Sequence, residues 1–247
     1  MSGHSKWHNI QAKKGKADAA RGKIFTKIGR EIAIAVREGG PDPYVNGKLR
    51  DVVAKAKANN MPNDNIQRSI KKAAGEAGSV MYEEIQYEGY GPGGVAVIVE
   101  TITDNRNRTA SEIRHCFAKW DGNMGTTGSV SFMFDKKGVV DVERTPGMDE
   151  DEFMMTALEA GADDVTPMDD VFEVYTAPND VTAVADALRE QGMNILTAEV
   201  QQLPQNMVDA DPATQEKIQN LLDMLDEDDD VSNVWHNCVL PEEEEEE

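Results

Sequence analysis

The first 30 residues of the chain carry eight cationic side chains against a single acid, Asp18. Ammonium and guanidinium groups bind phosphate oxygens and release counterions from a nucleic-acid backbone, so this pattern predicts a polyanionic ligand. Trp7 lies among the cations, where an indole can stack on an exposed base or pin the segment onto the protein. The plain alternative is a solvated basic surface. The predicted nucleic-acid-binding residues are Lys6, Trp7, Lys13, Lys14, Lys16, Arg21, Lys23, Lys27 and Arg30.

A second candidate site lies in the run 104–109, between a predicted strand and a predicted helix. Asn105, Arg106 and Arg108 stand there beside the N–H groups of a helix start, which together favour a phosphate or a carboxylate ligand. The alternative is that Asn105 and Thr109 cap the helix while the two arginines pair with acidic groups of the same chain.

Further cations follow in the next two predicted helices. They fit a helix-turn-helix-like domain, but solvent-facing lysines occur on any small helical bundle. No helix carries a cluster of Asn, Gln and Arg that would form a base-reading face. They include Lys48, Lys55, Lys57, Arg68, Lys71 and Lys72.

The sequence contains no constellation typical of an enzyme, a metal site or a cofactor site. The glycines of 89–94 match G-x-G-x-x-G, yet a strand follows them where a dinucleotide site needs a helix. His4 and His8 lack further ligands at metal spacing, and Cys116 and Cys238 form no C-x-x-C pair. We therefore expect no catalytic residue, no metal, no cofactor and no enzymatic activity.

Charge is distributed very unevenly along the 247 residues. The whole chain has 25 Lys and Arg against 46 Asp and Glu, a net charge of −21. Residues 1–78 have 16 and 7, a balance of +9, and the remainder have 9 and 39, a balance of −30. The basic third predicts a polyanion partner, whereas the acidic body predicts a different role. No apolar run reaches the roughly 20 residues of a membrane span, so we expect no membrane partner. The two cysteines show no disulfide framework, and free thiols suit a reducing compartment, so we expect a cytoplasmic protein.

Apolar periodicity predicts three helices after a basic arm that ends near residue 21. Their apolar stripes run over 24–36, 49–56 and 66–73, with Gly39-Gly40-Pro41 stopping the first and Asn63 or Asp64 capping the third. Residues 75–79 are then expected to form a linker. The acidic run Asp226–Asp230 is expected to cap a helix end, and Glu242–Glu247 to form a disordered tail.

The remaining pattern predicts two α/β modules. The first has a hairpin of strands 82–87 and 95–103, a helix with a Thr109–Glu112 capping box and a strand over 130–134. The second has the β-α-β-β-α-β order of a ferredoxin-like sandwich, with strands at 138–143, 165–168, 171–175 and 195–203 and helices at 149–160 and 181–191. Helix 212–226 and strand 234–239 are expected to return to the first module.

The predicted fold class is therefore α+β, with a helical amino-terminal domain and two α/β sandwich (ferredoxin-like) domains, the third inserted into the second. The expected domains are 1–80, 81–134 with 205–240, and 135–204.

Five motifs in this order link the chain to a known family. They are Gly3-His4-Ser5-Lys6-Trp7, Arg21-Gly22-Lys23-Ile24-Phe25-Thr26-Lys27, Asn59-Asn60-Met61-Pro62, Tyr87-Glu88-Gly89-Tyr90-Gly91-Pro92-Gly93-Gly94 and Asp104-Asn105-Arg106-Asn107-Arg108-Thr109. Together they resemble the YebC/PmpR family, whose mitochondrial relatives are translational activators. The likeness runs from Met1 to about Leu240 and leaves out the glutamate tail.

The resemblance implies the same three-domain fold and a regulatory role without catalysis. It also implies one of two ligands. The leading interpretation is a DNA-binding transcriptional regulatory protein. The alternative is a ribosome-associated translation factor that binds rRNA and relieves stalling on proline-rich nascent chains. Cationic contacts to a phosphate backbone would serve either role.

Overall fold

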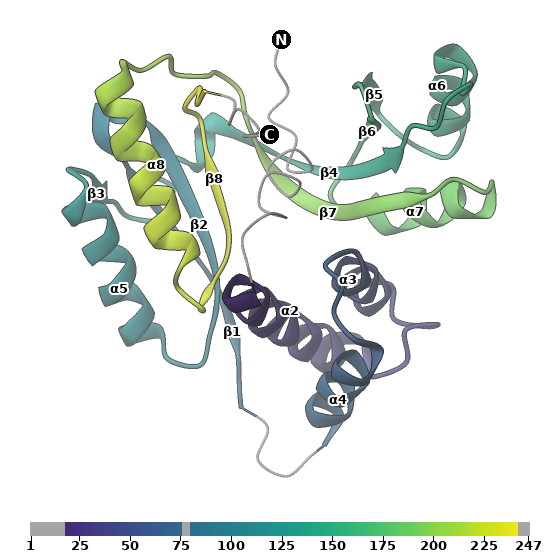
Figure 1. The fold of residues 1–247 in the computed structure, drawn as a ribbon, viewed down its shortest axis with the longest axis horizontal. Coiled ribbons are helices and arrows are strands. Elements are labelled where there is room, and N and C mark those ends of the chain that lie inside the picture. The colour runs from purple at the N-terminus through teal and green to yellow at the C-terminus, as the bar shows by residue number, and fades with distance from the viewer. Residues whose placement is uncertain (1–17, 76–79, 242–247) are drawn as a thin grey trace. The chain divides into compact units, whose positions relative to one another are not determined.

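A computed structural model describes residues 18–75 and 80–241 (Figure 1). Three helices come first, followed by strands and helices in mixed order. The helices are α2 (Asp18–Gly39), α3 (Gly47–Ala58), α4 (Asn63–Ala74), α5 (Arg106–Lys119), α6 (Glu150–Glu159), α7 (Val181–Glu190) and α8 (Pro212–Asp226). The strands are β1 (Glu83–Tyr90), β2 (Ala96–Thr103), β3 (Asn123–Met124), β4 (Phe134–Glu143), β5 (Asp164–Pro167), β6 (Val171–Thr176), β7 (Ile195–Pro204) and β8 (Val231–His236). No helix in these ranges is both long and apolar enough to cross a membrane.

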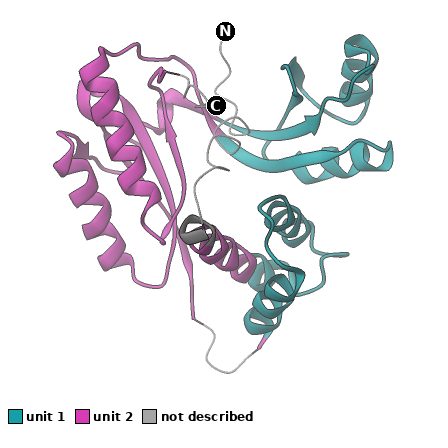
Figure 2. Cartoon of the chain, in the orientation of Figure 1, with its two compact units in different colours: residues 1–17, 35–74, 136–201 teal, residues 18–34, 75–135, 202–247 magenta. Residues whose placement is uncertain are grey.

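Contacts between Cα atoms group the chain into two units (Figure 2). Of the described residues, unit 1 comprises 35–74 and 136–201, and unit 2 comprises the rest. Helix α2 and strands β4 and β7 each have residues in both units. This division into two units does not test the three predicted domains, which remain a prediction.

Unit 2 contains a four-stranded sheet with the order β3-β1-β2-β8. All its neighbouring strands are antiparallel, and Tyr87 of β1 lies opposite Val99 of β2. Strand β8 enters this sheet after the whole second sheet has been traversed, which makes the second sheet an insertion. The predicted insertion of the third domain into the second is confirmed.

Strand β2 is buried on both of its faces, which explains its unbroken run of apolar residues. Alternate side chains of a strand point to opposite faces. Val97 and Val99 pack in a core with Phe117 of α5 and Leu221 of α8. Ala96 and Ile98 belong to a second cluster, whose other members are Val130, Phe134 and Trp235.

The predicted strand over 130–134 is wrong. Residues Ser131–Met133 form a 3₁₀ turn, Phe134 begins β4, and the third strand of the sheet is the short β3. The buried carboxylate of Glu88 accepts hydrogen bonds from the backbone N–H groups of Gly128, Val130 and Ser131, each at 2.9 Å. Because these donors are engaged by a side chain, they are lost to a strand ladder.

The glycine run before β2 contains the 3₁₀ turn Pro92–Gly94. Gly93 and Gly94 have φ angles of 69° and 77°, which a Cβ atom disfavours. A strand follows the turn, so the helix N-terminus that a dinucleotide site requires is missing here.

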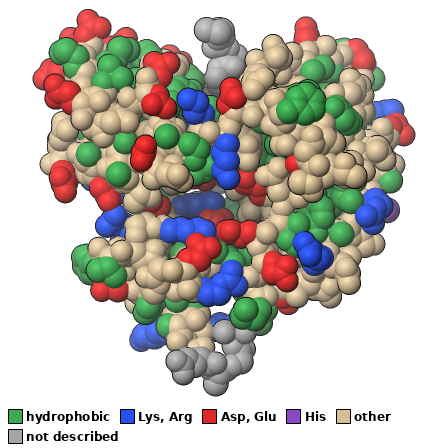
Figure 3. Space-filling view, turned by 180° about the vertical axis from the view of Figure 1, so that it is seen from behind, with side chains coloured by type: hydrophobic (Ala, Val, Ile, Leu, Met, Phe, Trp, Pro, Cys, Tyr) green, Lys and Arg blue, Asp and Glu red, His purple; other side chains and the backbone are tan. Residues whose placement is uncertain are grey.

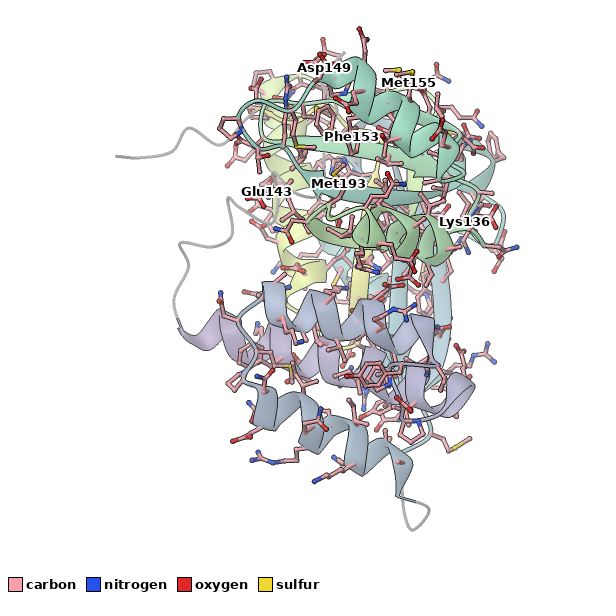
Figure 4. The ribbon with its side chains drawn as sticks, turned by 90° about the vertical axis from the view of Figure 1, so that its right-hand side faces the viewer. Lys136, Glu143, Asp149, Phe153, Met155 and Met193 are labelled. Atoms are coloured by element: carbon pink, nitrogen blue, oxygen red, sulfur yellow. The ribbon has the colours of Figure 1, made fainter. Side chains whose placement is uncertain are left out.

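In unit 1 a second sheet has the order β5-β6-β4-β7, the arrangement of a ferredoxin-like sandwich. Lys136 and Glu143 in Figure 4 mark the two ends of the part of β4 in this unit. Asp149 caps α6 by accepting the N–H of Glu152 at 3.0 Å. Phe153 of α6 is buried against the sheet, whereas Met155 lies on the outer side of the helix (Figure 4).

Helices α3 and α4 also belong to unit 1. Buried Asn46 starts α3 by accepting the Leu49 N–H at 3.0 Å. On α3, Asp51 accepts a hydrogen bond from Thr182 Oγ1 at 2.8 Å, and Arg50 forms an ion pair with Asp186. Burial raises the pKa of Asp51 above its usual value, with the Thr182 hydrogen bond opposing the shift. Polar contacts thus join α3 to α7 of the inserted domain.

Candidate nucleic-acid interface

Part of the predicted basic arm lies outside the described residues. This holds for Lys6, Trp7, Lys13, Lys14 and Lys16. Arg21 lies in the first turn of α2. The other three predicted residues, Lys23, Lys27 and Arg30, are spaced by four and three along α2, so they share one side of the helix.

This α2 stripe contacts the acidic segment Asp226–Asp230 at the end of α8. Lys23 Nζ donates to the Glu227 carbonyl at 3.3 Å. Lys27 Nζ donates to the carbonyl of Asp226 at 2.6 Å and to its carboxylate at 3.0 Å. Lysines at a helix C-terminus satisfy its unpaired carbonyls and its negative dipole end. The acidic segment therefore serves as a docking point for α2 within unit 2, a role that the sequence did not reveal.

Asp230 is the centre of this contact and is only 3% exposed at its side chain. Its Oδ1 accepts Arg30 Nη1 at 2.5 Å. Its Oδ2 accepts Arg108 Nη2 at 2.7 Å, Thr109 Oγ1 at 2.6 Å and Thr103 Oγ1 at 3.0 Å. Burial alone would raise the pKa of Asp230, but these hydrogen bonds outweigh it and hold the pKa below its usual value.

A cleft of about 620 Å³ lies beside Asp230. Its charged lining consists of three cations and five acids, so a phosphate would meet an excess of negative charge as the cleft stands. These residues are Lys23, Arg30, Arg108, Glu112, Glu227, Asp228, Asp229 and Asp230.

Carboxylate oxygens of Glu112, Asp228 and Asp230 come within 4.8 Å of one another in this cleft. Burial, and then the charge of Asp228, raise the pKa of Glu112. Both oxygens of Asp230 already accept bonds from protein donors. We therefore assign no metal to this group of acids.

The three residues of the second predicted site have different surroundings. Asn105 caps α5 by accepting the Arg108 N–H at 3.2 Å. The guanidinium of Arg108 binds Asp104 at 2.9 Å as well as Asp230. Arg106 is exposed, and its guanidinium makes no ion pair with any residue that the structure describes. The predicted capping box is wrong, because Thr109 lies inside the helix and uses its hydroxyl on Asp230.

Helix α4 carries exposed cations. In the sequence, these cations fitted a helix-turn-helix-like domain but were equally typical of any small helical bundle. Arg68, Lys71 and Lys72 have the i, i+3, i+4 spacing of one helix face, and all three are exposed. Among the described residues none of the three forms an ion pair. Asp64, in the first turn, is the one acidic side chain of the helix. This α4 face is consequently available to a phosphate backbone.

Side chains of both charges lie on the surface of the protein. On the face drawn in Figure 3, acidic side chains (red) and basic side chains (blue) are interspersed. Within unit 1, α4 presents a local cluster of basic side chains.

Comparison with known proteins gives matches over nearly the whole chain. The family description "TACO1/YebC protein N-terminal domain" matches residues 5–76, and "TACO1/YebC second and third domain" matches residues 82–238. A probable transcriptional regulatory protein of Clostridium novyi is 59% identical over 98% of this chain and 99% of that protein. Another, of Acetivibrio thermocellus, is 60% identical over 96% of this chain and 98% of its own length. The crystal structure of a conserved hypothetical protein from Aquifex aeolicus is 45% identical, covers 95% of this chain and 96% of that one, and superposes with a TM-score of 0.82.

Proposed function

This chain belongs to the TACO1/YebC family, and we propose that it is a nucleic-acid-binding regulator of gene expression that acts in the cytoplasm without a catalytic step. Its relatives carry the name probable transcriptional regulatory protein, which supports the regulatory class for the family. Duplex DNA is the leading ligand in this proposal.

The observation that carries the proposal is the exposed α4 face within a region of +9 balance. Lysine ammonium groups contact phosphates as point charges and select no base, so they fix the protein on a backbone. The arm residues Lys6, Trp7, Lys13, Lys14, Lys16 and Arg21, with Lys23, Lys27 and Arg30 of α2, are the further proposed contacts. Arg106 is a proposed contact at the start of α5, with Asn105 and Arg108 beside it.

The first prediction concerns the α4 face. The double variant Arg68→Gln/Lys71→Gln should weaken duplex binding and reduce the slope of log K against log salt by about two, because two phosphate contacts are lost. A titration of fluorescent duplex DNA at several salt concentrations measures both quantities.

The matched control is Arg114→Gln/Lys119→Gln on the exposed surface of α5, which removes the same two residue types and the same charge. Its salt slope should stay near that of the unmodified protein. Equal slopes for the two double variants would mean that α4 makes no phosphate contacts.

The ribosomal alternative uses the same backbone chemistry and differs in ligand. As a transcriptional regulator, the protein should prefer one promoter duplex to random duplex by at least about a thousandfold. As a translation factor, it should sediment with ribosomes at moderate salt and show little DNA sequence preference. Running the sedimentation beside the duplex titration separates the two.

A further inference from the structure

The contact between the α2 stripe and Asp226–Asp230 has an inner and an outer part. In the inner part, Arg30 donates to the Asp230 carboxylate and to the carbonyls of Asp229 and Ile102. The side chains of Arg30 and Asp230 are 16% and 3% exposed. A buried ion pair with several hydrogen bonds is costly to break, because either charge would be left without a partner.

The outer part is built from weaker contacts. Lys27, whose side chain is 11% exposed, pairs with Asp226, whose side chain is 52% exposed. Among the described residues, the exposed Lys23 donates to a backbone carbonyl and to no carboxylate. Water and salt screen the exposed carboxylate of Asp226, so its pair with Lys27 gains less than the buried Arg30–Asp230 pair. These two lysines can therefore exchange partners without disturbing the Arg30–Asp230 pair.

The acidic segment also resembles a phosphate backbone, because it offers a row of negatively charged and carbonyl oxygens as hydrogen-bond acceptors. Five consecutive residues, 226–230, are Asp or Glu, and they present carboxylate and carbonyl oxygens to a helix whose preceding residues are also cationic. A row of phosphates would present the same kind of acceptor at higher charge density.

We propose that Asp226–Asp230 is an internal polyanion that competes with nucleic acid for Lys23 and Lys27 of α2. This inference rests on the proposed function. In the absence of nucleic acid the acidic segment holds both lysines, and a bound phosphate backbone replaces its outer contacts while Arg30 stays on Asp230. The segment thereby lowers affinity for weakly charged or incidental anions.

The test compares two variants of α8 that each remove one negative charge. Asp226→Asn removes the charge that faces Lys27, and Asp223→Asn removes an exposed charge one turn earlier that accepts a hydrogen bond from Gln219. Both are titrated in the full chain against a short mixed-sequence DNA duplex. At low salt Asp226→Asn should bind about two- to fivefold more tightly than Asp223→Asn, and the ratio should approach one at about 300 mM salt.

A double-mutant cycle identifies the lysine through which the effect acts. In a Lys27→Gln background, Asp226→Asn should bring no gain over Asp223→Asn. A gain that persists without Lys27, or equal affinities of the two Asp variants in the unmodified background, would overturn the competition while leaving nucleic-acid binding intact. Failure of every variant, and of the unmodified protein, to bind DNA duplex or ribosomes would instead overturn the proposed function.

Discussion

At the scale of single residues, Asp230 determines how three segments of unit 2 meet. Its carboxylate binds Arg30 of α2, Arg108 and Thr109 of α5, and Thr103 of β2. A local sequence pattern identifies Asp230 only as the last member of an acidic run. Its role depends on partners 121 to 200 positions away in the chain.

We expect Asp230→Asn to lower the free energy of unfolding by about 3 kcal/mol, because Arg30 and Arg108 would then lose their buried counter-ion. Urea unfolding at pH 7 measures the change. The control is Asp229→Asn, whose exposed side chain should matter by no more than about 0.5 kcal/mol. Similar losses for both variants would mean that the buried contacts of Asp230 do not stabilise the fold.

The same carboxylate predicts a pH dependence. Its pKa in the folded protein is lower than in the unfolded chain, so folding favours the ionised form. The resulting stabilisation is fully present above the unfolded pKa of about 4 and is lost as the pH falls through the folded pKa. The difference in unfolding free energy between the unmodified protein and Asp230→Asn should therefore shrink between pH 5 and pH 3. A constant difference over that range, measured by urea unfolding, would contradict the lowered pKa.

At the scale of elements, the periodic patterns predicted most helices and strands, and local capping signals were less dependable. The Thr109–Glu112 pair fits a capping box by spacing, but Asn105 starts the helix four residues earlier. The hydroxyl of Thr109 donates a hydrogen bond to Asp230, a partner that sequence spacing cannot reveal. The prediction of a strand over 130–134 was wrong for a similar reason. The carboxylate of Glu88, on β1, accepts the backbone N–H groups of Val130 and Ser131.

The Asn105 cap can be tested directly. Asn105→Ala should lower the free energy of unfolding by about 1 kcal/mol, because the Arg108 N–H loses its acceptor. Asn105→Ser, which keeps a capping oxygen, should recover most of that loss in thermal unfolding. Asn107→Ala, inside the same helix turn and exposed, is the control and should change stability by no more than about 0.5 kcal/mol. A larger loss at Asn107 than at Asn105 would refute the cap assignment.

At the scale of the whole molecule, the sequence predicted the nested topology, and its motifs predicted the family. The second sheet already has its four strands before β8 begins in the sequence. The sheet of β1 and β2 therefore remains as the place where β8 can pair. The sequence could not predict which cations stay exposed. Lys27 and Arg30 contact acids roughly 200 positions away, whereas the α4 cations do not, and only the folded chain distinguishes them.

The last prediction concerns the contribution of the acidic run Glu242–Glu247 to the total charge of the protein. Replacing its six glutamates by glutamine changes the net charge from −21 to −15, which reduces the repulsion of a phosphate backbone. Duplex affinity should rise about twofold at low salt and stay unchanged at about 300 mM, where screening shortens the range of the tail's field. Fluorescence titration at both salt concentrations measures this.

Deletion of residues 242–247 removes the same charge and also shortens the chain, so it separates charge from length. If charge alone matters, the deletion and the six-glutamine variant should bind duplex equally well. A gain on deletion that the glutamine variant does not share would point to steric blocking by the tail. Unchanged affinity in both at low salt would show that the tail does not oppose nucleic-acid binding, and the charges of the folded acidic body would then be the ones that do.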